Sequence, residues 1–304
     1  MMKDTEIIGK INKLRKERDA VIVAHNYQRP EVQDIADYVG DSLGLSQEAA
    51  KTKAKTIVFC GVHFMAETAA IISPDKTVLI PDDNAGCPLA NMITVRQLKE
   101  EKAKYPDAVV VAYVNTIAAV KAESDYCCTS SNAVKIVSAI PKDKKIIFIP
   151  DQSLGSYVAN QTGRSLVLWK GYCPTHHRIL ARDILEHKKK YSNAKVVVHP
   201  ECLKEVIDLA DKVASTTGII KYCAESNAKE FIIGTEIGVL HKLRTDNPNK
   251  IFIEASKLAD CPNMKLNTLE KILWSLEDMV YKVTVPADIA QKAMRSIQRM
   301  LETT

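Results

Sequence analysis

The stretch KVVVHPE at residues 195–201 decides the fold, because two variants of it stand earlier in the chain. These are VIVAHN at 21–26 and VVVAYVN at 109–115, and each is a short apolar run that ends in polar residues. Such runs are typical of strands that are buried on both faces of a parallel sheet. Their recurrence indicates an internal repeat, and a repeat determines the whole architecture.

Further landmarks follow each run in the same order. Small hydroxyl residues come next, in VGDSLGL around Ser42, CCTSSNA around Ser130 and VASTTGI around Ser215 and Thr216. Each precedes a helix-like segment, so we expect these hydroxyls to cap helix N-termini. Two more strand patterns complete every unit. The last of them, TVLIPDD at 77–83 in the first unit, leads to a Cys-Pro pair and an amphipathic helix.

Strands that alternate with helices predict an α/β fold with right-handed crossovers. We therefore expect three similar three-layer αβα domains with parallel sheets, arranged around a pseudo-threefold axis. The predicted units are residues 1–90, completed by 280–304, then residues 91–177, and finally residues 178–279.

Composition narrows the classes of function. The chain has 304 residues, of which 46% are hydrophobic and 26% are charged, as in globular proteins. No apolar run approaches the ~20 residues that span a bilayer, and the charged N-terminal segment lacks the apolar core of a secretory signal. We expect a cytoplasmic protein without a membrane partner. A net charge of +5 and 6% aromatic residues argue against nucleic acid but suit small anionic substrates.

Three cysteines occupy one repeat position. Cys87, Cys173 and Cys261 each precede a proline and are separated by 86 and 88 residues. One cysteine at such a place is commonly a small buried hydrophobe, but three equivalent ones favour metal ligation. Three thiolates suit zinc or a cubane iron–sulfur cluster. Structural zinc sites usually take ligands in close CxxC pairs, which are absent from the sequence, so a [4Fe–4S] cluster with one open iron is favoured.

Polar residues follow the repeated strands, where parallel α/β sheets gather their ligands. The repeats should bring these residues and the cysteines to one central cavity. Glu201 is the only carboxylate among the three strand ends and is a candidate acid or base. The hydroxyls of the second landmark are also candidate anion sites, because helix N-termini bind anions. The candidates are His25, Tyr27, Tyr113, Asn115, His176, His199 and Glu201, with Ser42, Ser130, Ser215 and Thr216.

The motifs closely resemble those of quinolinate synthase, an enzyme of de novo NAD biosynthesis. They are AHNYQRPEVQDIADYVGDS, AYVNT, TSSNAV, VHPEC, GTEIGVLHKL and DCPNMKLNTLEKI, in order along the chain. The resemblance implies condensation of iminoaspartate with dihydroxyacetone phosphate to quinolinate, with loss of phosphate and water. It also implies an oxygen-sensitive [4Fe–4S] cluster at the junction of three αβα domains, and a supply of iminoaspartate from an aspartate oxidase or dehydrogenase.

The resemblance assigns roles to individual residues. It implies that Cys87, Cys173 and Cys261 hold the cluster, and that Tyr27 and Glu201 are an acid/base pair assisted by Tyr113. The implied iminoaspartate contacts are His25, Ser42, the stretch Tyr113, Val114 and Asn115, then Ser130, the stretch His199, Pro200 and Glu201, and Thr216. Some members of the family carry a CxxC arrangement at the last ligand. Met264 stands there in this chain, so we expect no disulfide switch.

Three other functions remain open at this point. An iron–sulfur hydratase of hydroxy acids would share the open iron. A redox or metal sensor would share the shell of three domains, although it would not need Tyr27 and Glu201. A zinc-stabilised protein that binds sugar phosphates would share the thiolates and the anion sites.

Overall fold

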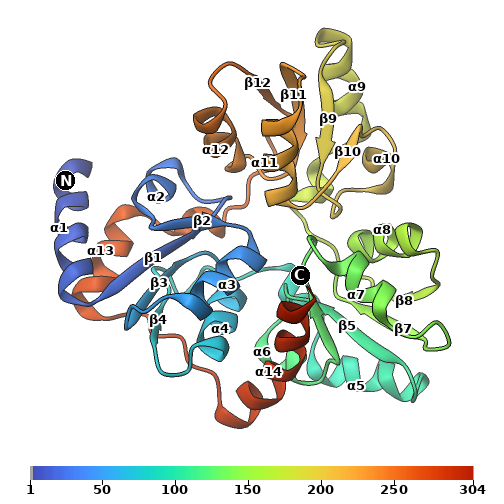
Figure 1. Ribbon diagram of the computed structural model, residues 1–304, viewed down its shortest axis with the longest axis horizontal. Coiled ribbons are helices and arrows are strands. Elements are labelled where there is room, and N and C mark those ends of the chain that lie inside the picture. Colours follow the sequence, from blue (N-terminus) through green and yellow to red (C-terminus); the bar gives the residue numbers. More distant parts are fainter. Residues whose placement is uncertain (1–2, 304) are drawn as a thin grey trace.

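A computed structural model describes residues 3–303 and contains three sheets of four parallel strands. The strand order is β2-β1-β3-β4 in the first sheet, β6-β5-β7-β8 in the second and β10-β9-β11-β12 in the third, so one topology occurs three times. The strands are β1 (Ala20–His25), β2 (Tyr38–Gly40), β3 (Thr56–Cys60), β4 (Thr77–Leu79), β5 (Val109–Tyr113), β6 (Tyr126–Cys128), β7 (Ile146–Ile149), β8 (Leu166–Leu168), β9 (Lys195–Val198), β10 (Lys212–Val213), β11 (Glu230–Gly234) and β12 (Ile251–Glu254). Figure 1 shows the three sheets as lobes around a common centre, which confirms the predicted fold class.

Helices cover both faces of the sheets. They are α1 (Asp4–Glu17), α2 (Pro30–Ile35), α3 (Ser42–Lys51), α4 (His63–Ile72), α5 (Val95–Lys104), α6 (Ala118–Ala122), α7 (Ala133–Ala139), α8 (Gln152–Thr162), α9 (Ala181–Lys190), α10 (Lys204–Ile207), α11 (Thr216–Glu225), α12 (Val239–Asp246), α13 (Leu269–Asp278) and α14 (Ala287–Glu302). Short 3₁₀ turns follow each Cys-Pro pair, η1 (Leu89–Met92), η2 (His176–Arg178) and η3 (Met264–Leu266). None of the helices within residues 3–303 is long and apolar enough to cross a membrane.

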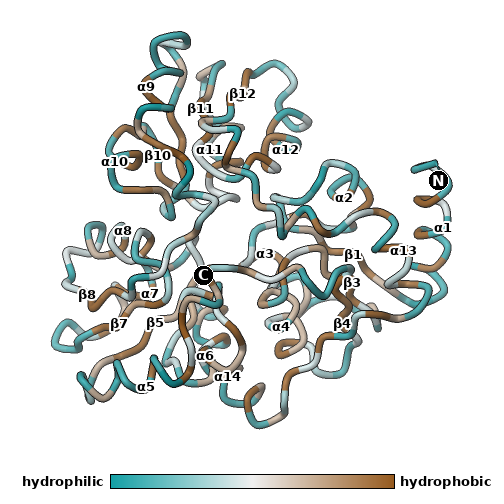
Figure 2. Tube along the Cα trace, turned by 180° about the vertical axis from the view of Figure 1, so that it is seen from behind, coloured by the Kyte–Doolittle hydropathy of each residue, from teal (hydrophilic) through white to brown (hydrophobic). Residues whose placement is uncertain are grey.

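The central strands are apolar on both faces, and this is why helices pack on either side. In the first sheet, Ile22 and Val58 contact the cluster formed with α1 and α13, whereas Val23 and Phe59 belong to the cluster formed with α3 and α4. The strands at the middle of the lobes are accordingly hydrophobic in Figure 2, and the outer helices carry the hydrophilic residues.

The C-terminal part of the chain returns to the first and second sheets. Helix α13 packs against α1 and β3, and the main-chain N–H of Val283 donates to the carbonyl oxygen of Val78 in β4. Helix α14 lies against α6 and β6, with a smaller contact to α4. The domain boundaries at residues 90, 177 and 279 stay a prediction, because α13 follows the third repeat in sequence and covers the first sheet in space.

Candidate functional site

The carboxyl ends of the three sheets meet at a central cavity of about 130 Å³. Most of the residues predicted from the sequence line it, namely His25, Tyr27, Ser42, Cys87, Tyr113, Asn115, Ser130, Cys173, His176, His199, Glu201, Thr216 and Cys261. Three predicted contacts lie outside its lining. Val114 is part of the apolar core, whereas Pro200 and Ser215 line a neighbouring hollow between the second and third sheets. The repeat thus brings residues that are far apart in sequence to one place.

Three of the eight cysteines line the cavity and differ from the other five in their exposure. Cys87, Cys173 and Cys261 are partly exposed, and the remaining cysteines are buried. None of the eight forms a disulfide. Burial, with smaller effects from the charges of Cys261 and Glu201, raises the pKa of the Cys87 thiol to about 12. Cys87 in turn raises the pKa of Cys173, after the larger effects of burial and Glu201. All three cysteines line the one cavity.

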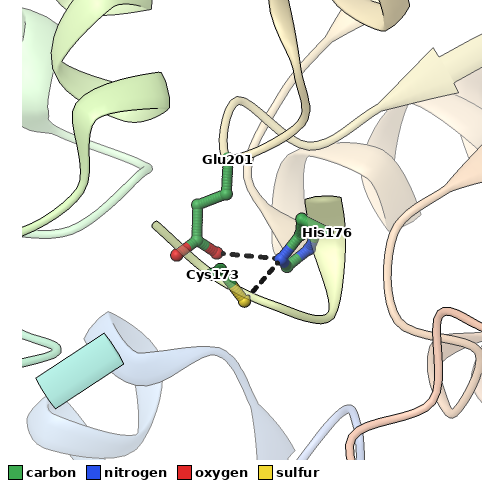
Figure 3. Close-up of side chains that lie close together, drawn as sticks. All are labelled: Cys173, His176 and Glu201. Carbon is green, nitrogen blue, oxygen red and sulfur yellow. Dashed lines mark hydrogen bonds and ion pairs between the residues drawn. The ribbon is translucent and has the colours of Figure 1, made fainter. Parts of the chain in front are cut away.

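A carboxylate and two imidazoles meet next to Cys173. His176 Nδ1 lies 3.2 Å from Cys173 Sγ and 3.2 Å from Glu201 Oε2, as Figure 3 shows. His199 Nδ1 lies 3.3 Å from the same carboxylate oxygen. Burial lowers the pKa of His176 to about 3, so this imidazole is neutral near pH 7. Burial, with a smaller effect of Asp151, raises the pKa of Glu201, whereas a hydrogen bond from Tyr113 lowers it. Glu201 is thereby suited to carry a proton.

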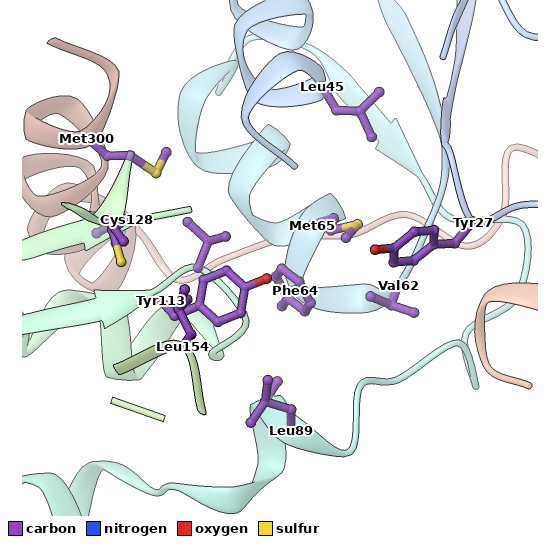
Figure 4. Packing of buried hydrophobic residues seen from close by; sticks show 14 of the residues in the cluster. Tyr27, Leu45, Val62, Phe64, Met65, Leu89, Tyr113, Cys128, Leu154 and Met300 are labelled. Atoms are coloured by element: carbon purple, nitrogen blue, oxygen red, sulfur yellow. The ribbon is translucent and has the colours of Figure 1, made fainter. Parts of the chain in front are cut away.

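The Tyr27 side chain crosses from the first repeat to the third. Its hydroxyl lies 2.8 Å from Thr216 Oγ1 and 2.6 Å from Thr235 Oγ1, and Thr235 lies 2.9 Å from His176 Nε2. Burial raises the pKa of Tyr27, so the hydroxyl keeps its proton. Figure 4 shows the hydroxyls of Tyr27 and Tyr113 pointing toward one another. Thr235 escaped the sequence analysis, although it directly follows the buried strand β11.

The predicted caps are correct at one of three places. Ser215 Oγ accepts the N–H of Gly218 at 3.2 Å and caps α11. At α3 the cap is Asp41, whose carboxylate accepts the N–H of Gly44, so the prediction for Ser42 is wrong. Ser130 is no cap either, because α7 begins three residues later and the Ser130 hydroxyl lies 3.1 Å from His199 Nε2. Ser42 and Ser130 both line the cavity.

Two buried carboxylates hold the cysteine loops, and the sequence analysis missed both. Asp151 Oδ2 accepts the N–H of Cys173 at 3.1 Å, and Glu236 Oε1 accepts the N–H of Cys261 at 3.0 Å. Burial raises the pKa of both carboxyl groups to about 7. Each residue stands just after the third strand of its repeat, where the first repeat has Val62. Asp151 in the motif IPD and Glu236 in the motif GTE stand at the same repeat position, and this match could have identified them from the sequence.

The side chains present fit an iron–sulfur cluster. Three thiol groups from three repeats line one cavity, and thiolates are the ordinary ligands of such clusters. Two polar atoms of the cavity, Asn115 Oδ1 and Glu201 Oε1, are buried without a hydrogen-bond partner among the described residues. Buried polar groups are rarely left unpaired, so these atoms point to a bound molecule. Cys173, His176 and Glu201 also place three ligand atoms within 4.8 Å of one another, which suits a single metal ion.

Known proteins match the chain over its length. The family described as "Quinolinate synthetase A protein" matches residues 9–302. A quinolinate synthase of Methanosarcina barkeri is 53% identical, over 99% of this chain and 98% of its own. A quinolinate synthase of Dehalococcoides mccartyi is 56% identical, over 99% of both chains. One of Geobacter metallireducens is 56% identical, over 99% of this chain and 98% of its own.

Proposed function

The chain belongs to the quinolinate synthase family and is an enzyme of that activity, and we propose that it acts on iminoaspartate and dihydroxyacetone phosphate in the central cavity. The products are then quinolinate, phosphate and water. The observation that supports this assignment best is that three thiols, Glu201 and Tyr27 line one cavity. These residues come from all three repeats of the chain. Because iminoaspartate is unstable, an enzyme that oxidises aspartate has to supply it.

We propose Cys87, Cys173 and Cys261 as the ligands of a [4Fe–4S] cluster. The lining of one cavity by all three thiols supports this set. When bound, the cluster supplies a Lewis-acidic iron that orients the substrate and draws off charge.

The substrate carboxylates are proposed to bind to His25, Ser42, Asn115, Ser130, His199 and Thr216. The amide oxygen of Asn115 has no hydrogen-bond partner within residues 3–303, and we propose that it accepts a hydrogen bond from the imine nitrogen or from a hydroxyl of the second substrate. Ser130 Oγ is held by His199 at 3.1 Å, so the hydroxyl is oriented before the substrate arrives. Orientation of this kind lowers the entropic part of the barrier.

Tyr27 and Glu201 are the proposed acid/base pair, with Tyr113 assisting. Loss of phosphate and water needs protons at the leaving oxygens and bases at the carbon and nitrogen atoms. Burial raises the pKa of both groups and so favours their protonated forms. Close polar contacts join them: the Tyr27 hydroxyl is hydrogen-bonded to Thr235, Thr235 is hydrogen-bonded to His176, and His176 Nδ1 lies 3.2 Å from Glu201 Oε2. These contacts let a proton that one group gives up be replaced from the other.

A matched pair of variants tests the assignment. Glu201→Gln, purified without oxygen, should keep the visible iron–sulfur absorption and lose roughly 100- to 10,000-fold in quinolinate formation, the usual contribution of an acid or base. Cys87→Ala should lose the absorption itself, whereas Cys223→Ala, which changes a buried cysteine of α11, should keep both absorption and turnover. Normal turnover by Glu201→Gln removes that residue from the mechanism.

A metal ion is the alternative that one observation favours. The ligand atoms of Cys173, His176 and Glu201 lie close enough for zinc, whose usual ligands include sulfur, nitrogen and carboxylate oxygen. Iron, sulfide and zinc analysis of the anaerobically purified chain separates the two. Stoichiometric zinc without sulfide would refute the cluster, and loss of iron from Cys261→Ala would refute the zinc site, since Cys261 is outside the trio.

A further inference from the structure

A buried ion pair lies beside the cavity, where the first and third repeats meet. The Lys265 ammonium donates to Glu236 Oε1 at 2.9 Å and also to the main-chain oxygen of Tyr27. Glu236 is fully buried, and the side chain of Lys265 is 16% exposed. A more exposed carboxylate, that of Asp260, lies 3.8 Å from the same ammonium. Lys265 therefore has one partner in the third repeat and another in the first.

Glu236 carries the connection on to a proposed cluster ligand. Its Oε1 accepts the N–H of Cys261 at 3.0 Å, and its Oε2 accepts the N–H of Gly238 at 2.7 Å. Lys265 thus links the main chain of Tyr27 to the loop of Cys261 through a single carboxylate. Tyr27 is bound to the third repeat at its side chain as well, because its hydroxyl contacts Thr216 and Thr235.

The ion pair and the Tyr27 main chain approach so closely that a side chain at position 238 would not fit between them. A Cβ atom there would lie 2.7 Å from Lys265 Nζ, 2.8 Å from Glu236 Oε2 and 2.8 Å from the carbonyl carbon of Tyr27. The backbone of Gly238 has φ −61°, which any residue adopts, so conformation does not call for glycine here. The absence of a side chain lets the ion pair and the Tyr27 main chain approach one another.

The second repeat shows what the cation adds. Asp151 holds the Cys173 loop as Glu236 holds the Cys261 loop, yet within residues 3–303 it bonds only to main-chain N–H groups, such as those of Leu154 and Cys173. A cation is therefore not needed to hold a cysteine loop. A buried ion pair also contributes little net stability compared with apolar residues of the same volume. The feature that distinguishes the third repeat is the contact with Tyr27.

We propose that Lys265 is a positioning residue, which fixes the main chain of Tyr27 relative to the Cys261 loop through Glu236. The role rests on the proposed function, in which Tyr27 moves a proton and Cys261 holds the cluster. Lys265 touches neither substrate nor iron in this scheme. It acts by fixing the distance between the proton donor and the cluster across the junction of two repeats.

The test uses the full chain, loaded with its cluster without oxygen. Lys265→Met should keep the iron content and lose roughly 10- to 100-fold in kcat, with the KM values little changed, as is usual when a group that orients a metal site is removed. A chelator should bleach its visible absorption faster than that of the parent protein. Lys265→Arg should restore much of the turnover, since a guanidinium donates to both oxygens. The matched control is Lys204→Met, which removes an exposed ion pair with Asp208.

The possible outcomes separate the explanations. A lysine that only stabilises the fold would lower the unfolding temperature and leave kcat and bleaching equal to those of Lys204→Met, and this result overturns the proposal. If Lys265→Met fails to fold, Gly238→Ala provides the test, because it keeps both charged side chains but places a methyl group where they approach the Tyr27 main chain. If kcat and the rate of bleaching of Gly238→Ala equal those of the parent protein, the proposal is overturned. A parent chain that makes no quinolinate or binds no cluster refutes the proposed function instead.

Discussion

The hydroxyl of Tyr27 offers a prediction in which stability and activity change by very different amounts. Tyr27→Phe removes two hydrogen bonds, of 2.8 Å to Thr216 and 2.6 Å to Thr235. Thr235 keeps its bond to His176, but the Thr216 hydroxyl loses its only side-chain partner among residues 3–303. An unpaired buried hydroxyl costs about 1–3 kcal/mol. In a chain of this size the unfolding temperature should fall by about 2–6 °C.

Turnover should fall far more steeply. Burial raises the pKa of Tyr27, and the charges of Glu201 and Glu236 raise it further, so the hydroxyl is protonated at neutral pH. A positioned proton donor contributes about 100- to 10,000-fold to a rate. We expect kcat of Tyr27→Phe to fall by a factor in that range, while the cluster absorption stays unchanged because no cysteine is touched.

The assay is anaerobic quinolinate formation, measured beside a thermal unfolding curve of the same preparation. Tyr105→Phe is the control, since Tyr105 lies outside the cavity and meets Lys145 through its ring. Equal turnover of the two variants would show that Tyr27 moves no proton in the slow step. An equal loss of folded protein and of turnover would assign Tyr27 to stability alone.

Three further predictions concern the fold and its dependence on pH. Gly155→Ala should cost about 1–3 kcal/mol in urea unfolding, because a Cβ would lie 2.6 Å from Leu168 and 2.8 Å from Phe148; parent stability would show that β8 moves freely. Phe231→Ala, at the buried ring that stacks on Phe252 with centroids 5.5 Å apart, should cost about 3–5 kcal/mol in the same measurement, and a loss below that range would mean that the core collapses around the gap. Burial lowers the pKa of His25 to about 4 from 6.5, so the unfolded chain takes up a proton between these values that the folded chain does not, and stability falls as the pH falls from 6.5 to 4. His25→Asn should remove up to about 1.4 kcal/mol per pH unit from that slope, and an unchanged slope would place the titration on other groups.

The repeat made most of the fold predictable. Because β-branched runs, hydroxyls and Cys-Pro pairs recur in one order, the strands, their parallel direction and the meeting of their carboxyl ends follow from local pattern. The place of α13 does not follow. Its amphipathic sequence resembles that of the helices after Cys87 and Cys173, but there is no fourth sheet in the described chain, and α13 packs beside α1 on the first. The sheet on which α13 packs depends on which sheet face the other helices leave uncovered.

The site was predictable where residues stand at strand ends and was missed where contacts cross between segments. Tyr27 and Glu201 lie within three residues of the ends of β1 and β9, and the sequence pattern alone marks them. The role of Glu236 arises from a loop 25 residues later in the chain, whose N–H it accepts. Lys265 has a partner 238 residues away. Spacing within one segment holds no information about contacts of this length. Hydroxyls fail for another reason, since Ser42 and Asp41 are equally good caps by residue type.

The division of the cavity among three sheets also imposes a schedule on synthesis. The ribosome synthesises Cys87, Cys173 and Cys261 at separate times, because they are separated by 86 and 88 residues. At about 5–20 residues per second, each gap lasts roughly 4–18 s. A metal group bound by all three thiols can enter only after the last has emerged. Until then the thiols of Cys87 and Cys173 cannot bind the complete cluster and are exposed to oxidants in solution.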